Sequence, residues 1–298
     1  MHKSGFINII GRPNAGKSTL MNALVGERMS IITSKPQTTR HRIIGILSGD
    51  DFQMVFSDTP GIIEDPSYKM QEVMNSFVNS TFEDSDIMLF VTGVDEKFKP
   101  TDPVIEKLKR VEAPIILVLN KTDLAKPEEV LQKIQFWNNL ISFKETVPIS
   151  ALQQKNTDVL FKLLLDYLPE GPVYYPKDQL TDRPERFFVS EIIREKILML
   201  YEQEIPYSCE VIVTAFKEDQ TNSGADLVRI SAEIYVARNT QKSIIIGKGG
   251  SAIKKLGTLA RKDLETFLEK KVFLELFVKV KDNWRNDERM LKHFGYQG

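Results

Sequence analysis

Two glycines, a lysine and a serine occur at a spacing that suits phosphate binding. Residues 11–18 read Gly-Arg-Pro-Asn-Ala-Gly-Lys-Ser and follow an apolar run at 6–10. In a loop between a strand and a helix, backbone N–H groups point at a β-phosphate, and Lys17 would contact the β- and γ-oxygens. An ordinary glycine turn is the alternative, but the strand before the loop and the helix after it favour a phosphate loop. The residues predicted to hold the phosphates are Gly11, Arg12, Pro13, Asn14, Ala15, Gly16, Lys17, Ser18 and Thr19.

A second loop, Asp58-Thr59-Pro60-Gly61, ends another strand-like run. Its aspartate is placed to reach Mg²⁺ through water, while the Ser18 hydroxyl would bind the ion directly. The Gly61 N–H would meet a γ-phosphate, so this loop would sense whether that phosphate is present. All four residues belong to the predicted nucleotide site.

Residues 28–42, here called the switch segment, contain few core residues and include Thr38 and Thr39. One threonine would complete the Mg²⁺ shell once a triphosphate binds, and Thr39 is favoured over its neighbour. A flexible surface loop is the alternative, and it also describes this segment with a diphosphate bound. Order that depends on the γ-phosphate is what makes a switch. The predicted metal ligands are Ser18, Thr39 and Asp58.

The tetrapeptide Asn120-Lys121-Thr122-Asp123 closes a strand and suits recognition of guanine. Asp123 can accept from N1–H and N2–H₂ of guanine, whereas adenine presents an acceptor at N1 and would repel the carboxylate. Asn120 would brace the loop and the Lys121 stem would cover the base. After the last strand, Ser150-Ala151-Leu152 would offer a backbone N–H to guanine O6. The sequence therefore predicts a site for GTP and GDP.

These loops must be positioned by strands that alternate with helices. Apolar runs predict strands, amphipathic patterns predict helices between them, and such alternation indicates a mostly parallel sheet covered by helices on both faces. Ligands of such sheets bind beyond the carboxyl ends of the strands, where the loops above lie. Strands are predicted at 6–10, 42–47, 53–57, 87–91, 115–119 and 147–149, and helices at 17–25, 70–82, 104–111, 128–140 and 159–168.

A change in composition separates this α/β domain, residues 1–168, from the rest. Three prolines and a glycine in 168–178 predict a linker at 169–184, whose tyrosines allow it to pack. Residues 185–298 read as a smaller α+β domain with the order α-β-β-α-α-β. Its helices are predicted at 188–202, 239–246 and 251–269, and its strands at 209–217, 228–235 and 272–280.

A second glycine loop, Gly247-Lys248-Gly249-Gly250, joins the last two of these helices. Small residues let a phosphate backbone approach closely, as in the G-x-x-G loop that clamps about four single-stranded nucleotides. Between residues 238 and 262 there are seven basic residues and no acidic one, although a solvated helix face is the alternative. An apolar groove is expected at 244–246 and Ile253. The predicted RNA-binding residues are Gly247, Lys248, Gly249, Gly250, Lys254, Lys255, Arg238, Lys242 and Arg261.

The composition is that of an ordinary globular protein. The 298 residues are 42% hydrophobic and 27% charged, with a net charge of −1, so a nucleic-acid site must be a local patch. A single cysteine, Cys209, in an apolar run suggests a core residue in a reducing compartment. The N-terminus leads directly into a strand and no apolar run approaches about 18 residues, so we expect a cytoplasmic protein with only peripheral membrane contact.

The motif order G-x-x-N-x-G-K-S, T-T-R, D-T-P-G, N-K-x-D and S-A-L resembles the Era-type GTPases of the translation-factor class. The resemblance continues through residues 36–42, 247–257 and 278–285, and covers essentially the whole chain. It implies a P-loop GTPase domain followed by a type II KH domain. It also implies GTP hydrolysis with Mg²⁺, and a monomer that binds 16S ribosomal RNA near its 3′ end during assembly of the 30S subunit.

One position departs from Ras-type GTPases. Ile62 follows Gly61 where those enzymes carry the glutamine that orients the attacking water, so slow intrinsic hydrolysis is expected. Similar GTPases with an asparagine at the position of Asn14 use it to hold K⁺ beside the phosphates; a loop asparagine with an unusual backbone conformation is the alternative. An RNA or ribosomal partner that completes the site is a third possibility. The residues predicted to act in catalysis are Lys17, Thr39, Gly61 and Asn14.

Two other functions compete with this interpretation. The basic stretch could contact acidic lipid weakly, which would suit a membrane-associated cell-cycle GTPase, partly at the inner face of the cell membrane, with a protein-binding C-terminal domain. A metabolic P-loop enzyme is remote, because residues 120–123 select guanine and no acceptor site is evident.

Overall fold

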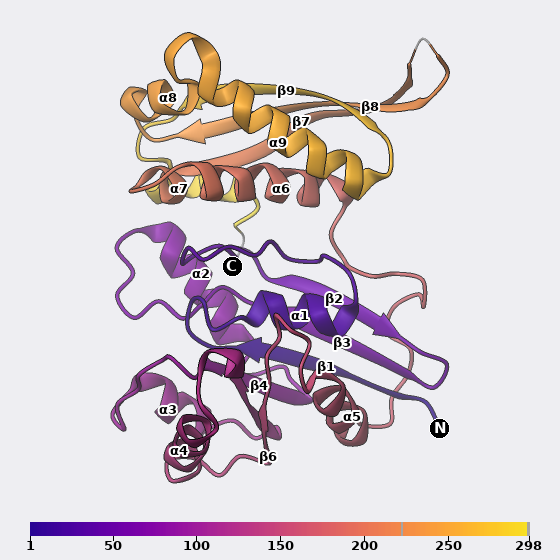
Figure 1. The fold of residues 1–298 in the computed structure, drawn as a ribbon, viewed down its shortest axis with the longest axis vertical. Helices are drawn as coiled ribbons and strands as arrows, with labels where there is room; N and C mark the ends of the chain where they lie inside the picture. The colour runs from indigo at the N-terminus through magenta and orange to yellow at the C-terminus, as the bar shows by residue number, and fades with distance from the viewer. Residues whose placement is uncertain (222, 297–298) are drawn as a thin grey trace. The chain divides into compact units, whose positions relative to one another are not determined.

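The chain folds into two units, each built on its own sheet (Figure 1). The structure, a computed structural model, describes residues 1–221 and 223–296. The first unit comprises Met1–Pro66 and Gln71–Asp182, and the second comprises Ser67–Met70 and the described residues from Arg183 to Tyr296. The predicted linker therefore lies mostly within the first unit. The predicted end of the second domain at residue 298 lies outside the described residues.

The first unit contains a six-stranded sheet in the order β2-β3-β1-β4-β5-β6. The edge strand β2 is antiparallel to β3, and every other pair is parallel, which confirms the mostly parallel sheet. The strands are β1 (Lys3–Ile10), β2 (Ile43–Ser48), β3 (Phe52–Asp58), β4 (Ile87–Gly93), β5 (Ile115–Asn120) and β6 (Glu145–Pro148).

Helices cover both faces of this sheet. Met88 and Phe90 of β4 pack with Trp137 in one apolar cluster, while Ile87 and Leu89, which point to the opposite face, are equally buried. Burial of alternate residues on both sides explains why these strands read as continuous apolar runs. The helices are α1 (Lys17–Val25), α2 (Lys69–Ser80), α3 (Pro103–Leu108), α4 (Pro127–Asn138) and α5 (Thr157–Tyr167).

The segment predicted as a linker packs along the first sheet. The Gln53 side chain of β3 accepts hydrogen bonds from the backbone N–H groups of Tyr174 and Tyr175 at 2.7 and 2.9 Å. The N–H of Ile46, on the edge strand β2, donates to the Leu180 carbonyl at 2.8 Å. Because these bonds satisfy polar groups of the sheet and its edge, residues 174–180 are part of the structure of the first unit.

The second unit has a three-stranded sheet in the order β7-β8-β9, with β7 antiparallel and β9 parallel to β8. Its core forms where the helices α6, α8 and α9 pack on one face, and Cys209 is fully buried there. The predicted element order is present. The elements are α6 (Glu185–Leu200), α7 (Ile205–Ser208), β7 (Cys209–Gln220), β8 (Asp226–Val236), α8 (Asn239–Ile246), α9 (Ser251–Leu268), β9 (Lys271–Val280) and α10 (Glu288–His293).

Short helical pieces were missed by the sequence analysis. Trp284, in a single 3-10 turn that precedes α10, is fully buried and donates its indole N–H to the Ser208 carbonyl at 3.1 Å. These pieces are too short to show a helical period, and distant contacts stabilise them. Among the described residues, no helix combines the length and the apolar character required to cross a membrane.

Candidate functional site

A cavity of about 520 Å³ opens at the carboxyl ends of the strands in the first unit. Six segments of the sequence meet there: the phosphate loop, the switch segment, and the loops after β3, β4, β5 and β6. The cavity is lined by Pro13, Asn14, Gly16, Lys17, Ser18, Thr19, Ile31, Ile32, Thr33, Ser34, Gln37, Thr38, Thr39, Gly61, Asp95, Asn120, Lys121, Asp123, Leu124 and Leu152.

Lys17 is the first residue of α1 and lies under the phosphate loop. Its ammonium group donates to the carbonyls of Gly11 and Arg12 at 3.1 and 2.9 Å, and the side chain is buried. Burial lowers the pKa of this ammonium, whereas the nearby carboxylates of Asp58 and Glu96 raise it. A buried positive charge at the base of a loop of backbone N–H groups suits the oxygens of a polyphosphate.

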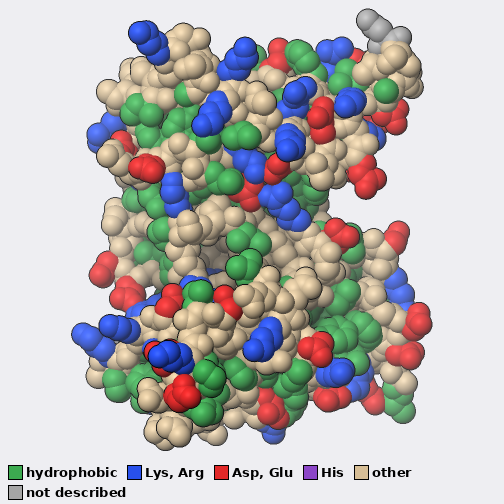
Figure 2. All heavy atoms as spheres, viewed as in Figure 1, with side chains coloured by type: hydrophobic (Ala, Val, Ile, Leu, Met, Phe, Trp, Pro, Cys, Tyr) green, Lys and Arg blue, Asp and Glu red, His purple; other side chains and the backbone are tan. Residues whose placement is uncertain are grey.

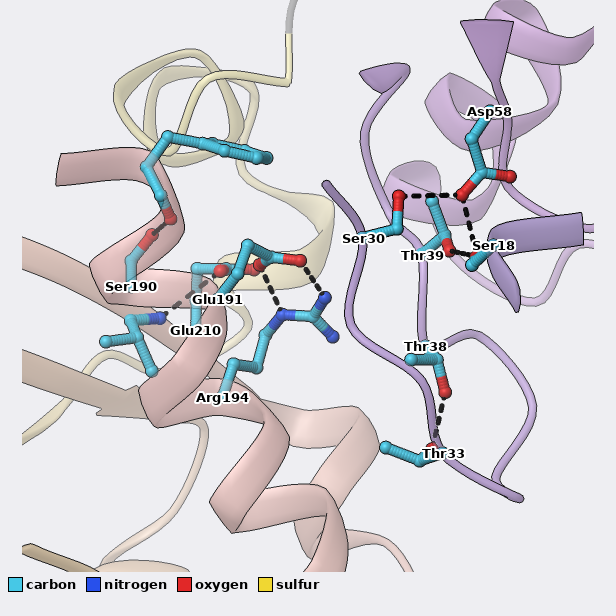
Figure 3. Close-up of polar contacts among 12 residues, drawn as sticks. Ser18, Ser30, Thr33, Thr38, Thr39, Asp58, Ser190, Glu191, Arg194 and Glu210 are labelled. Atoms are coloured by element: carbon cyan, nitrogen blue, oxygen red, sulfur yellow. Dashed lines mark hydrogen bonds and ion pairs between the residues drawn. The ribbon is translucent and has the colours of Figure 1, made fainter. Parts of the chain in front are cut away.

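A cluster of oxygens lies beside Lys17. The Ser18 hydroxyl donates to Asp58 at 2.6 Å and lies 2.9 Å from the Thr39 hydroxyl, and Ser30 also donates to Asp58 (Figure 3). The other carboxylate oxygen of Asp58 is buried and has no hydrogen-bond partner among the described residues. Burial raises the pKa of Asp58, while Lys17 and the hydroxyl donors lower it. Hard oxygen ligands around an unsatisfied carboxylate oxygen fit Mg²⁺.

The two threonines of the switch segment have different hydrogen-bond partners. The Thr38 hydroxyl donates to the Lys35 carbonyl and lies 2.7 Å from the Thr33 hydroxyl, within its own loop (Figure 3). Thr39 instead lies beside Ser18. The geometry therefore favours Thr39 as the metal ligand.

The loop after β3 packs tightly on the phosphate loop. A side chain on Gly61 would place Cβ 2.4 Å from the Pro13 nitrogen, so only glycine fits there. Thr59 and Pro60 are buried and do not line the cavity, and the Thr59 hydroxyl donates to a carbonyl of β1. Ile62 packs against the apolar cluster beneath α3 and α4, which agrees with a side chain that orients no water.

Asn120 joins three loops at the other end of the cavity. Its amide donates to the Ala15 carbonyl at 2.9 Å, and its oxygen accepts from the N–H groups of Lys121 and Ala151 at 2.8 and 3.0 Å. Gly16 must be glycine here, because its φ is 94° and a Cβ would lie 2.2 Å from the Asn120 amide nitrogen. Asn120 thus braces the loops around the predicted base.

The Asp123 carboxylate is exposed at the cavity and makes no side-chain hydrogen bond to the described residues. Lys121 forms an ion pair with Asp95 at 3.2 Å, and this second carboxylate was missed because it belongs to no motif. Leu152 lines the cavity and is 77% exposed, whereas Ser150 is fully buried.

Arg12 is the predicted phosphate residue whose side chain lies away from the cavity. Its guanidinium contacts Glu64 and Asp102 instead of the phosphate position. Only its backbone can take part in the phosphate loop.

The glycine loop of the second unit has a backbone conformation that favours glycine. Gly247, Gly249 and Gly250 have φ angles of 72°, 59° and 77°, and a Cβ on Gly247 would lie 2.6 Å from that of Ala252. Open space surrounds the other two glycines, so another molecule can approach their backbone closely. The loop leads into the N-terminus of α9, which attracts anions.

The basic residues near this loop have no acidic partners within residues 1–221 and 223–296. Six of the seven are exposed and Lys242 is half-buried; in the described part of the chain none forms an ion pair. In the view of Figure 2, Lys and Arg side chains lie over α8 and α9. The seven are Arg238, Lys242, Lys248, Lys254, Lys255, Arg261 and Lys262.

The apolar groove lies between α9 and β9, which corrects part of the expectation. A hollow of about 350 Å³ is lined by Ile253 as predicted, but Ile245 is fully buried in the core. Ile244 is 49% exposed and Ile246 is half-buried, but neither lines this hollow, which Leu274 and Leu276 of the edge strand β9 line instead. The sequence gives little signal for them, because Phe273 and Phe277, which alternate with them along β9, are apolar but exposed. The remaining lining residues are Lys254, Gly257, Thr258 and Arg261.

Comparisons with known proteins identify relatives of both units. A family model described as 50S ribosome-binding GTPase matches residues 6–121, and a KH domain model matches residues 204–285. The chain is 51% identical to the GTPase Era of Syntrophus aciditrophicus (strain SB), over 99% of this chain and 96% of that protein. It is 45% identical to a chloroplastic GTPase ERA-like protein of Oryza sativa subsp. japonica, over 100% of this chain and 70% of that one.

Two solved structures match over nearly the full length. One is Era in complex with MgGDPNP and nucleotides 1506–1542 of 16S ribosomal RNA, with a TM-score of 0.94, 38% identity and 100% of both chains covered. The other is a variant of Aquifex aeolicus Era bound to GDP·AlF4⁻, with a TM-score of 0.93 and 38% identity, over 99% of this chain and 100% of that one.

Proposed function

Because this chain belongs to the Era family of GTPases, we propose that it is a monomeric switch in the assembly of the small ribosomal subunit. It binds and hydrolyses GTP in the first unit and holds small-subunit ribosomal RNA near its 3′ end on the KH domain. The observation that carries the proposal is the presence on one chain of two sites. One is a cavity lined by the phosphate loop and by Asp123, and the other is a glycine loop near basic residues that form no ion pair with the described residues.

The residues around the cavity have different roles in GTP hydrolysis. Lys17 neutralises charge on the β- and γ-phosphates, and the Gly61 N–H orients the γ-phosphate. Ser18, Thr39 and Asp58 would hold Mg²⁺, which withdraws charge from the phosphate oxygens. None of these groups activates water, so the chain's own residues position the triphosphate and leave intrinsic hydrolysis slow.

Replacing Thr39 is expected to weaken the triphosphate state selectively. Thr39→Ala should lower the Mg²⁺-dependent affinity for a GTP analogue by about tenfold, the cost of one ligand to a charged group, and leave the affinity for GDP within about twofold. Titration calorimetry with and without Mg²⁺ measures both. Thr38→Ala is the matched control, since that hydroxyl donates to the Lys35 carbonyl and contacts the Thr33 hydroxyl, both inside the switch segment, and not the Ser18 hydroxyl that Thr39 contacts. A larger loss of analogue affinity in Thr38→Ala than in Thr39→Ala would reverse the assignment.

A potassium ion is proposed to supply part of the missing catalytic charge. The Asn14 amide donates to the Ser34 carbonyl of the switch segment at 2.9 Å, which leaves its side-chain oxygen available at the phosphate end of the cavity. We expect hydrolysis in K⁺ to exceed that in Na⁺ by about tenfold, and Asn14→Ala to remove the difference. Steady-state phosphate release in the two salts measures this. Equal rates would indicate that Asn14, with φ 64°, only suits the loop backbone.

The choice of partner is tested by separating ribosomal from membrane binding. We propose a cytoplasmic protein, and the exposed lysines would also permit weak contact with the inner face of a membrane. Crosslinking in cells should recover small-subunit RNA, and the protein should co-sediment with 30S particles. Flotation with acidic vesicles in the absence of particle binding would favour the membrane-associated alternative.

A further inference from the structure

The Arg12 side chain makes four contacts outside the nucleotide cavity. Its guanidinium donates to the Lys97 carbonyl at 2.9 Å, to Asp102 at 2.6 Å and to Glu64 at 2.8 Å, and its carbon lies 4.1 Å from the centre of the Phe98 ring. These partners come from two segments of the chain, residues 97–102 and the loop that follows Gly61. Such a planar, multiply bonded arrangement is specific to arginine.

The contacts with residues 97–102 fix the guanidinium. Phe98 packs in an aromatic cluster, with its ring 4.7 Å from that of Trp137. Asp102 is the N-cap of α3, yet its carboxylate makes no capping bond to the helix and pairs with Arg12, and its side chain is only 8% exposed. The buried Asp102 carboxylate pairs with Arg12 and does not cap the helix, so it holds the guanidinium in place.

The remaining contact, with Glu64, reaches the loop expected to sense the γ-phosphate. Three residues before Glu64, Gly61 packs on Pro13 and lines the cavity, and the Ile62 N–H donates to the Gly11 carbonyl at 3.3 Å. The Glu64 side chain is 59% exposed, so its ion pair is the weaker and more readily broken of the two. The Arg12–Glu64 pair therefore links the anchored guanidinium to the loop that follows Gly61.

We infer that Arg12 is a positioning residue that holds residues 61–66 against the phosphate loop, with the Gly61 N–H at the γ-phosphate. The inference rests on the proposed function, since it requires a γ-phosphate to be recognised. Arg12 contributes to the preference for GTP over GDP without touching the nucleotide through its side chain. Because Arg12 acts on the nucleotide site through Glu64 and the loop after Gly61, its loss should change the ratio of the affinity for a GTP analogue to the affinity for GDP.

The test measures the affinities of the full chain for a non-hydrolysable GTP analogue and for GDP, each with Mg²⁺. Glu64→Gln should lower the analogue-to-GDP affinity ratio two- to fivefold in low salt, and about 1 M salt should reduce this effect because the pair is exposed. Arg12→Ala should lower the ratio about tenfold, and Arg12→Lys should not restore it, since lysine lacks the fork and the stacking surface. Glu112→Gln, an exposed carboxylate elsewhere in the first unit, should leave the ratio unchanged.

Arg12→Ala leaves Asp102 buried and unpaired, so the fold itself could suffer. The double variant Arg12→Ala with Asp102→Asn removes that charge and should show the same loss in the ratio. Equal losses of analogue and GDP affinity, or a wild-type ratio in the double variant, would mean that Arg12 only supports the fold. Failure of the wild-type chain to bind either nucleotide would instead overturn the proposed function, and this inference with it.

Discussion

Asp123→Asn is expected to move the preference of the cavity from guanine to xanthine nucleotides by about 10²- to 10⁴-fold in relative affinity. The carboxylate accepts from both N1–H and the 2-amino group of guanine. An amide in its place turns one acceptor into a donor, which opposes the 2-amino group and matches the carbonyl oxygen that xanthine has there. The variant loses affinity for guanine nucleotides because a charge-assisted hydrogen bond is removed and a donor is left unmatched.

The structure indicates that this substitution changes base recognition without disturbing the fold. Asp123 is exposed and makes no side-chain bond to the described residues, so replacing it should leave the fold unchanged. Competition between GTP and XTP for a fluorescent nucleotide measures the preference. Asp95→Asn is the matched control, because this carboxylate also lines the cavity but pairs with Lys121, and it should change affinity without changing base preference. Undiminished GTP binding in Asp123→Asn would refute the role of Asp123.

The backbone of the nucleotide site was predictable because short-range chemistry determines it. The phosphate loop requires a strand before it and a helix after it, and α1 begins and ends at the predicted residues. The Asn120 loop follows a strand that could be recognised by its apolar run alone. Where neighbouring residues determine the backbone conformation, the local sequence pattern is sufficient to predict it.

Side-chain positions that depend on contacts between distant segments could not be predicted from the sequence. Arg12 was assigned to the phosphate loop by its place in the motif, but the motif does not predict where its side chain lies, because Asp102, 90 residues away in the sequence, pairs with it. Ile245 was expected in a groove because it is apolar and near the glycine loop, yet the core of the second unit takes it. Neither outcome follows from periodicity, since each depends on which distant segment packs against the residue.

Two aspartates in the glycine loop are expected to abolish RNA binding and leave the nucleotide site intact. Lys248→Asp combined with Gly249→Asp replaces one positive charge and adds two negative ones where a phosphate backbone would lie. Open space surrounds Gly249, and aspartate tolerates its φ of 59° better than most residues, so the domain should still fold. We expect RNA affinity to fall by about 100-fold or more in moderate salt, because each phosphate contact contributes through counterion release.

The measurement is RNA affinity as a function of salt, together with GTP affinity and hydrolysis. The wild-type chain should lose RNA affinity steeply as salt rises, and the variant should show a shallower slope, since fewer phosphates are neutralised. Lys217→Asp with Gln220→Asp makes the same charge change at exposed positions of β7 and should retain RNA binding, which separates the loop from net charge. Loss of GTP and RNA binding together would show that the two units do not function separately. Retained RNA binding would place the RNA elsewhere on the second unit, because a clamp built on this loop cannot hold a phosphate backbone against two carboxylates.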